Sequence, residues 1–219
     1  MAKKSSGPDR FPGWPPEALD WFRGLEANNS REWFQAHRAT YDQAVRGPLE
    51  LLLSEVAGEF GDGKVSRPNR DIRFSPDKTP YKNRIYAVVG RPAGGGGWYV
   101  QLNKEGIFAG GGLHAPDSKT VARIRAAIAD ETTGPDLERI VGRMAQSGVH
   151  LFQELSLRTA PRGYASDHPR IELLRLKVYA AGVDYPAEPW LHTPEAKNRV
   201  VSAWRAVTPL LEWLGRVGA

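Results

Sequence analysis

Residues 70 to 83 read RDIRFSPDKTPYKN and contain the side chains best suited to bind a ligand. Cations, carboxylates and a phenol follow one another closely here: Arg70, Asp71, Arg73, Asp77, Lys78, Tyr81 and Lys82. Guanidinium and ammonium groups bind phosphates and carboxylates through charge-assisted hydrogen bonds. The stretch therefore predicts an anion pocket in which these arginines and lysines bind the ligand and Tyr81 donates a further hydrogen bond. In such a pocket, Asp71 would orient an arginine or act as a base.

The same residues also fit a purely structural interpretation. If residues 70–74 form a strand, Arg70 shares a face with Ile72 and Phe74 and needs a partner there. A network of Arg–Asp ion pairs that fixes the hairpin to a neighbouring helix would supply that partner. Composition does not decide between the pocket and the network, so both interpretations stay open.

The distribution of charge supports an anionic partner at this one place. The chain has 30 Lys and Arg residues and 25 Asp and Glu residues, a formal net charge of +5. Residues 64–91 contain eight of the positive residues and only two of the negative ones, a local balance of +6, which leaves −1 for the remainder. An anionic small molecule is thus predicted here, and nucleic acid is a second, less favoured partner.

A second candidate element is the glycine-rich stretch FAGGGLHAP at residues 108–116. Glycines at the end of a strand remove every side chain, so that another backbone or a ligand can approach closely. We call residues 64–91 the basic stretch. We expect Gly111 and Gly112 to line a pocket near it, with His114 at the edge of that pocket.

Several classes of chemistry find no support in the sequence. The chain has no cysteine, which excludes disulfides and thiolate nucleophiles. Its five histidines are scattered, without the spacing of a helical metal site, so we predict no metal site. No catalytic residue, cofactor or oligomeric state is assigned. We find no signal peptide and no apolar run long enough to span a membrane, and expect a cytoplasmic protein.

The elements that must position these residues fall in the order helices, strands, helices. Apolar residues recur at helical spacing in the segments 15–26 and 48–60 and again after residue 116. Short stretches rich in aromatic and β-branched residues predict strands over 70–74, 84–90, 98–103 and 106–112, and another over 174–182. The order predicts an α+β fold, with a mainly antiparallel β-meander packed against N-terminal and C-terminal helices.

The stretch NNSREWF at residues 28–34 looks structural. Ser30 is placed to cap a helix, and the large rings of Trp33 and Phe34 are expected to pack in the core. For the chain as a whole, we expect a disordered leader over residues 1–10 and a single domain over 11–219.

The order of charged and aromatic residues in the basic stretch also resembles a known signature. Arg67, Arg70, Asp71, Arg73, Phe74, Lys78 and Tyr81 form the pattern R-x-x-R-D-x-R-F-x-x-x-K-x-x-Y. This resembles a bacterial family known as domain-of-unknown-function family 2461. The likeness extends to NNSREWF, GGGLHAP at 110–116 and APRGYASDHP at 160–169, and so covers most of the chain. The resemblance implies one domain of nearly full length, without an established activity and without assigned catalytic residues.

Three functions stay open on this basis. The chain is expected to bind a small phosphorylated or other anionic ligand at the basic stretch, as an enzyme or as a binding protein. The alternatives are a nucleic-acid-associated module and an interaction domain in which the Arg–Asp network is purely structural. The first two differ in salt dependence, because affinity for nucleic acid falls steeply with salt, in proportion to the phosphates contacted.

Overall fold

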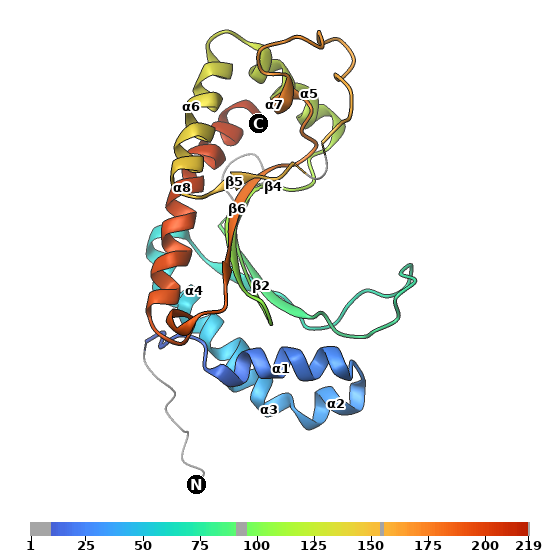
Figure 1. The fold of residues 1–219 in the computed structure, drawn as a ribbon, viewed down its shortest axis with the longest axis vertical. Coiled ribbons are helices and arrows are strands. Elements are labelled where there is room, and N and C mark those ends of the chain that lie inside the picture. The colour runs from blue at the N-terminus through green and yellow to red at the C-terminus, as the bar shows by residue number, and fades with distance from the viewer. Residues whose placement is uncertain (1–9, 91–95, 154–155, 219) are drawn as a thin grey trace. The chain divides into compact units, whose positions relative to one another are not determined.

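The computed structural model describes residues 10–90, 96–153 and 156–218, so Arg91 and almost all of the expected leader lie outside the described residues. Helices precede and follow a six-stranded sheet, which confirms the α+β fold (Figure 1). The helical segments are α1 (Pro16–Ala27), α2 (Arg31–Ala36), α3 (Arg38–Thr40), the π-helical η1 (Tyr41–Arg46), α4 (Gly47–Phe60), α5 (Ser118–Ala129), α6 (Thr133–Gln146), α7 (Ile171–Leu174), the 3₁₀ turn η2 (Pro189–His192) and α8 (Glu195–Gly218).

The sheet has the strand order β1-β2-β3-β4-β6-β5. Its strands are β1 (Gly63–Val65), β2 (Arg84–Val89), β3 (Gly97–Asn103), β4 (Gly106–Leu113), β5 (His150–Leu151) and β6 (Tyr179–Pro186). The pairs β1–β2 and β5–β6 are antiparallel, and the first four strands form the expected meander in chain order. Helices α5 and α6 occupy the connection from β4 to β5, and β6 pairs between these two strands.

The chain divides into two compact units. One takes its described residues from Met1–Gly90, Tyr99–Phe108 and Asp184–Val201, and the other from Arg91–Trp98, Ala109–Val183 and Ser202–Ala219. Strands β3, β4 and β6 and helix α8 contribute residues to both units. The basic stretch up to Gly90 belongs to the first unit, whereas the glycine-rich stretch from Ala109 onward and His114 belong to the second. The expectation of a single domain over 11–219 stays a prediction.

Aromatic side chains form the core of the first unit. Trp21 on α1 lies 5.0 Å from the Tyr41 ring, 5.3 Å from that of Phe22 and 5.6 Å from that of Phe34, measured between centroids. These four rings are at most 4% exposed, and burial of large aromatic surface is the main stabilising contribution of such clusters. Ser30 caps α2, as expected, by accepting a hydrogen bond from the Trp33 amide at 3.2 Å.

The prediction that both rings of NNSREWF lie in the core is confirmed for one of them. Phe34 is 2% exposed, whereas Trp33 is only half-buried and stacks on His37 with ring centroids 4.0 Å apart. Trp33 lies against Gly24 of α1, where an added Cβ would come within 2.5 Å of the Trp33 ring. Trp33 therefore covers the α1–α2 corner from outside and does not fill the interior.

In the second unit, a buried arginine binds the carbonyl groups at the C-terminal end of helix α5. Arg170 is 6% exposed and donates to the carbonyl oxygens of Ile128 at 2.6 Å and Ala129 at 3.1 Å, and it pairs with Glu131 at 3.0 Å. The last carbonyl groups of a helix have no intrahelical donor, so the guanidinium satisfies groups that burial would otherwise leave unpaired. No helix in the described part of the chain is long and apolar enough to cross a membrane.

Candidate functional site

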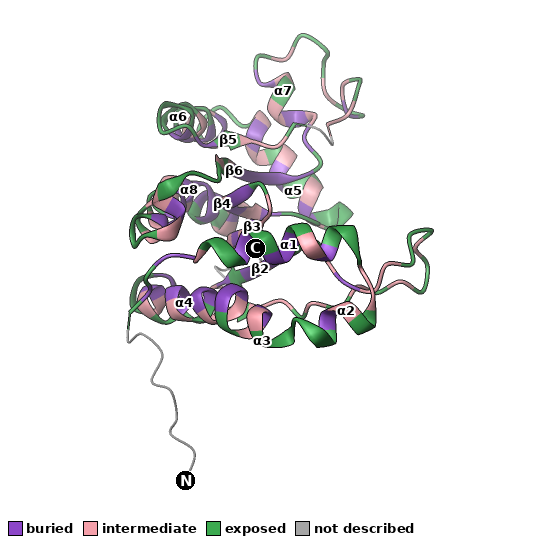
Figure 2. Cartoon of the chain, turned by 60° about the horizontal axis from the view of Figure 1, so that its bottom comes forward, coloured by how far each residue is buried: buried purple, intermediate pink, exposed green. Residues whose placement is uncertain are grey.

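A long loop between β1 and β2, residues 66–83, carries most of the predicted site and is called the basic loop below. It projects beyond the start of β2, and its residues are mostly exposed or half-buried (Figures 1 and 2). The expected strand over 70–74 is wrong, because these residues are irregular and Phe74 is 94% exposed. Without a strand there, Arg70 does not share a buried face with Phe74. The Arg70 side chain instead has hydroxyl and carboxylate partners within the loop.

Proline carbonyl groups close the base of the basic loop. The Lys82 amide donates to the Pro68 carbonyl oxygen at 2.9 Å, and the Arg70 amide donates to that of Pro80 at 2.9 Å. Between these bonds lies an isolated antiparallel bridge from Asn69 to Tyr81. Proline lacks an amide hydrogen, so Pro68 and Pro80 can accept ladder bonds but cannot donate them. The two arms therefore pair for a few residues without forming a regular strand.

Asn29 and Phe34 hold the second arm of the loop in place. Asn29, between α1 and α2, accepts a hydrogen bond from the Tyr81 amide at 3.1 Å and donates one to the Tyr81 carbonyl oxygen at 3.0 Å. The Tyr81 ring stacks on Phe34 with centroids 4.1 Å apart and is 6% exposed. Tyr81 thus anchors the loop to the aromatic core and fixes the position of the residues that follow it.

Arg70 braces the distal part of the loop from within. Its guanidinium donates to Asp77 and to the Thr79 hydroxyl, and Asp77 also accepts from the Thr79 amide at 2.9 Å. The bond from Arg70, followed by those from Thr79, lowers the pKa of Asp77 to about 2. This ion pair is the structural network predicted as one interpretation of the motif, although it lies within the loop and not against a helix.

Arg73 and Lys78 also have partners within the loop. Arg73 binds Asp71 through two parallel hydrogen bonds of 2.9 and 2.7 Å, and this guanidinium lowers the pKa of the Asp71 carboxyl. The ammonium of Lys78 donates to the Ile72 carbonyl oxygen at 3.0 Å. Both cations therefore hold the loop in shape.

Lys82 differs from Arg70 and Arg73 because its hydrogen-bonding partners are carbonyl groups, and two other positive side chains lie near it. Its ammonium donates to the carbonyl oxygens of Arg67 at 2.5 Å and Asn69 at 2.8 Å. Partial burial lowers the pKa of Lys82, and the nearby charges of Arg67 and Arg84 lower it further. Three positive charges thus lie close together at the base of the loop.

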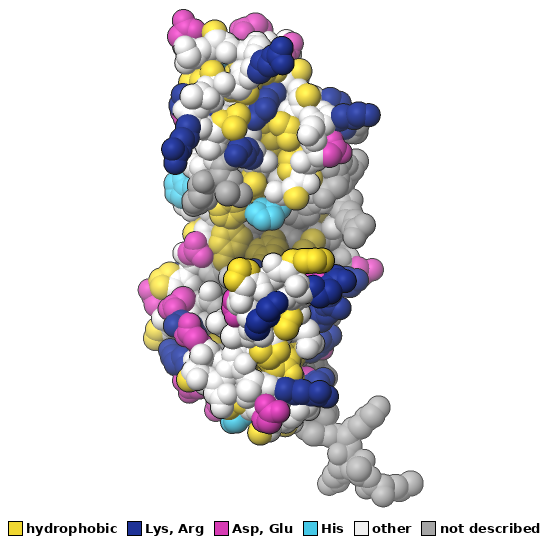
Figure 3. All heavy atoms as spheres, turned by 90° about the vertical axis from the view of Figure 1, so that its right-hand side faces the viewer, with side chains coloured by type: hydrophobic (Ala, Val, Ile, Leu, Met, Phe, Trp, Pro, Cys, Tyr) yellow, Lys and Arg dark blue, Asp and Glu magenta, His cyan; other side chains and the backbone are white. Residues whose placement is uncertain are grey.

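Four of the predicted residues line one hollow of about 370 Å³. Its lining consists of Arg70, Asp71, Tyr81, Lys82, Asn83 and Arg84, and it is called the basic hollow below. Arg73 and Lys78 are not among the lining residues. Figure 3 views the molecule from the side toward which the loop projects, and Lys and Arg side chains are scattered over the face that it shows.

The glycine stretch has a structural explanation within the second unit. A Cβ on Gly112 would lie 2.3 Å from the Ala180 Cα of β6, and one on Gly111 would lie 2.8 Å from the Gly97 carbonyl oxygen of β3. Close approach of neighbouring strands therefore requires glycine at both positions. His114 is exposed just after β4. That these three residues line a pocket with the basic loop stays a prediction.

Sequence reasoning missed Asn29, Asn83 and Arg84. Asn29 and Tyr81 form a hydrogen bond although they are 52 residues apart in the sequence, and no local pattern predicts such a contact. Arg84 had a detectable signal, because it belongs to the stretch of high positive charge, but it was assigned only to a strand. Among the residues that the structure describes, no three His, Asp or Glu side chains gather in a way that could hold a metal ion.

Comparisons with known proteins agree with the resemblance of the basic stretch. The model of a family described as "Conserved hypothetical protein (DUF2461)" matches residues 17–213. No curated protein and no solved structure matches the chain. The matched region spans the aromatic core, the basic loop, the sheet and most of α8. The chain therefore belongs to the DUF2461 family.

Proposed function

We propose that this protein binds a small anionic ligand, with a phosphate group as the preferred anion, in the basic hollow. The lining supplies three cations, Arg70, Lys82 and Arg84, against one carboxylate, Asp71. That carboxylate is already paired with Arg73, which reduces its repulsion of an incoming anion. The volume of about 370 Å³ lies within the range of small-ligand sites.

The observation that carries the proposal is the environment of Lys82. An ammonium has three N–H donors, and two of them bind carbonyl groups of the loop. The third donor has no hydrogen-bond acceptor in the described part of the chain, where the ammonium lies 5.6 Å from the centroid of the Tyr86 ring. The neighbouring charges of Arg67 and Arg84 disfavour the ammonium. An anion in the hollow would accept that hydrogen bond and relieve the repulsion between the three cations.

The other arginines and lysines of the motif take a supporting role in this proposal. Asp77 and Thr79 orient Arg70, so that its guanidinium can contact an anion while it remains paired. Arg73 and Lys78 shape the distal loop and do not bind the ligand. Tyr81 positions Lys82 and Asn83 through its fixed backbone and is itself one of the lining residues.

Two lysine variants with the same change of charge test the proposal. Calorimetry would measure the binding of inorganic phosphate and pyrophosphate to the wild type, Lys82→Met and Lys78→Met. We expect Lys82→Met to weaken binding at least about tenfold, because a charge-assisted hydrogen bond is lost. Lys78→Met should stay within about twofold, since Lys78 does not line the hollow. A ligand at a hundred times its dissociation constant should also raise the melting temperature by roughly 5 to 10 °C.

Two results would overturn the proposal. One is equal weakening by the two lysine variants, which would indicate a diffuse effect of net charge. The other is the absence of binding by phosphate, pyrophosphate and a panel of phosphorylated metabolites. In the second case the Arg–Asp pairs of the loop would be purely structural, and the chain would be an interaction domain.

One observation favours nucleic acid as a second candidate partner. Phe74, at the far part of the basic loop, is 94% exposed, and the Arg73 guanidinium lies 5.9 Å from its ring centroid. Exposed rings beside cations are the stacking platforms of proteins that bind single strands. Fluorescence anisotropy with single-stranded oligonucleotides would then show binding that falls steeply with salt and weakens in Phe74→Ala. Binding without either dependence would exclude this candidate.

A further inference from the structure

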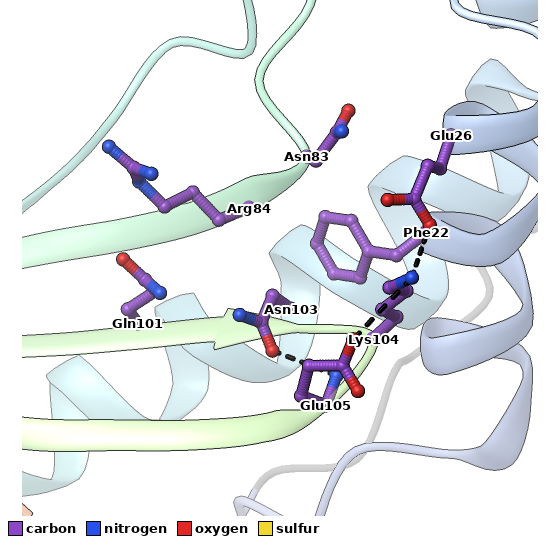
Figure 4. Close-up of a pocket in the computed structure, with 8 residues that line it drawn as sticks. All are labelled: Phe22, Glu26, Asn83, Arg84, Gln101, Asn103, Lys104 and Glu105. Atoms are coloured by element: carbon purple, nitrogen blue, oxygen red, sulfur yellow. Dashed lines mark hydrogen bonds and ion pairs between the residues drawn. The ribbon is translucent and has the colours of Figure 1, made fainter. Parts of the chain in front are cut away.

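A second hollow of about 190 Å³ lies in the first unit and shares two lining residues, Asn83 and Arg84, with the basic hollow. Its lining comes from α1, from the start of β2 and from the end of β3 with the turn after it: Phe22, Glu26, Asn83, Arg84, Gln101, Asn103, Lys104 and Glu105 (Figure 4). It is called the amide hollow below, because three of these residues are carboxamides. Its volume is below the range of complete ligand sites, which fits a site for part of a ligand.

Backbone hydrogen bonds fix the orientation of the Asn103 amide. The Asn103 oxygen accepts from the amides of Glu105 at 2.9 Å and Gly106 at 3.1 Å, and a backbone N–H can only donate. The oxygen therefore faces the turn, and the NH₂ group must point elsewhere. Figure 4 shows this nitrogen on the side toward Gln101. No acceptor in the described part of the chain binds this NH₂ group, so its two donors are open to a ligand.

The Asn83 amide is oriented through a relay that starts at the loop backbone. The two hydrogen bonds between Asn29 and Tyr81 determine which end of the Asn29 amide is oxygen and which is nitrogen. The Asn29 nitrogen then also donates to the Asn83 oxygen at 3.1 Å. Asn83 must accordingly present its NH₂ group as the unused end. The hydrogen bonds thus determine which end of each of these two lining carboxamides is the NH₂ donor.

The remaining polar side chains of the lining are those of Arg84, Gln101, Lys104, Glu26 and Glu105. Arg84 lines the hollow from the start of β2, and its guanidinium carries only N–H donors. The carboxylates of Glu26 and Glu105 share the ammonium of Lys104, at 2.5 and 3.5 Å. The formal charges of the four charged residues cancel. The two carboxylates disfavour a second anionic group, and the polar lining disfavours an apolar one.

We infer that the amide hollow binds the polyhydroxylated part of a ligand whose phosphate lies in the basic hollow, so that the ligand class is a sugar phosphate or polyol phosphate. The inference rests on the proposed function. A hydroxyl group both donates and accepts, so it can bind a carboxamide NH₂ and a carboxylate at once. Asn83 and Arg84 line both hollows and would contact the ligand where its phosphate joins its polyol part.

The test compares affinities for a phosphate with and without an attached sugar. Calorimetry would measure Kd for inorganic phosphate, ribose 5-phosphate and glucose 6-phosphate, and the readout is the ratio of the phosphate Kd to the lower sugar phosphate Kd. We expect a ratio of about 10 or more in the wild type, as two or three additional net hydrogen bonds provide.

Variants of residues in each hollow distinguish the contributions of the two hollows to binding. Asn103→Asp keeps the oxygen that binds the turn but removes the NH₂ donors, and Gln101→Met removes a lining amide without a change of charge. Both should lower the ratio about fivefold, and the ratio cancels a general effect of charge on the phosphate. Lys82→Met should weaken phosphate and sugar phosphate by the same factor and leave the ratio unchanged.

The possible failures are distinguishable. If phosphate binds through Lys82 but the ratio is near 1, or if neither amide variant changes it, this inference is wrong and the proposed function stands. If neither phosphate nor a sugar phosphate binds, or if binding is insensitive to Lys82→Met, the proposed function fails and the inference fails with it. Circular dichroism and thermal unfolding of each variant show that a loss of binding does not come from unfolding.

Discussion

At the scale of single residues, Asp77 should make the free energy of unfolding depend on pH in the acid range. Folding lowers the pKa of its carboxyl from 3.8 to about 2, chiefly through Arg70. The ion pair therefore makes its full contribution to the stability of the folded state above pH 3.8. This contribution disappears as the pH falls through about 2. Thermal unfolding should show Asp77→Asn less stable than the wild type at neutral pH, with the difference shrinking toward pH 2. A constant difference over that range, or an equal trend in the exposed control Asp62→Asn, would contradict the assignment.

Removal of the Phe34 ring should lower the unfolding free energy more than removal of the neighbouring Trp33 ring. Phe34→Ala removes a ring that is 2% exposed and stacked on Tyr81, so we expect a loss of about 3 to 5 kcal/mol in unfolding free energy. Trp33 is only half-buried, and Trp33→Ala should cost less, about 1 to 3 kcal/mol. Denaturant titration of both variants provides the comparison. A larger loss for Trp33 would contradict the burial seen here.

Local patterns predict the type of a residue's environment better than its partner. The cap at Ser30 follows from its place before a helix. Ring size predicted burial of both Trp33 and Phe34 and was right only for Phe34. The sequence predicted Arg–Asp pairs that fix the hairpin to a neighbouring helix, whereas Arg70 and Arg73 pair with Asp77 and Asp71 within the loop. Which aspartate each arginine contacts depends on the path of the chain. Contacts such as that of Asn29 with Tyr81 join distant segments and are invisible to periodicity.

Among elements, strand β4 depends on its glycines to pair closely with β6. Gly112 has φ +146°, and a Cβ there would lie 2.3 Å from the Ala180 Cα. We expect Gly112→Ala to destabilise the fold by about 2 to 4 kcal/mol, because the neighbouring backbone must shift. The matched control is Gly142→Ala in α6, where no atom lies within 4 Å of the added Cβ. That change should be neutral or stabilising by up to about 1 kcal/mol in thermal or denaturant unfolding. A neutral Gly112→Ala would show that the strands can separate without cost.

Helices and the meander strands were predictable because their periodicities differ clearly. Apolar residues at helical spacing correctly placed α1, α4, α5 and α6, and aromatic and β-branched stretches placed β2, β3 and β4. The prediction of a strand for the stretch RDIRF was wrong, because this segment has no neighbouring strand to pair with. The prolines at 68, 76 and 80 cannot donate to a ladder, and hydrogen bonds from Arg70, Arg73 and Lys78 shape this segment as a loop.

Across the whole molecule, the position of a charge should matter more for binding than the net charge. Lys82→Gln and Arg143→Gln each lower the formal net charge of +5 by one. Arg143 is exposed on α6 in the second unit, whereas Lys82 lines the basic hollow. We expect a phosphate titration to show at least about a tenfold loss for Lys82→Gln and a change of less than about twofold for Arg143→Gln. Equal losses would mean that the chain attracts anions only through its overall charge.

The environment of Lys82 has a consequence for covalent labelling. A lysine with a lowered pKa loses its proton more easily, and the neutral amine is the nucleophile that acylating reagents attack. At limiting reagent and mildly alkaline pH, Lys82 should therefore be modified ahead of Lys104, whose pKa the Glu26 carboxylate raises. Peptide mass mapping of a labelled sample would report the occupancy of the basic hollow directly. Compounds that protect Lys82 from acylation could then be selected from a metabolite mixture before their identity is known.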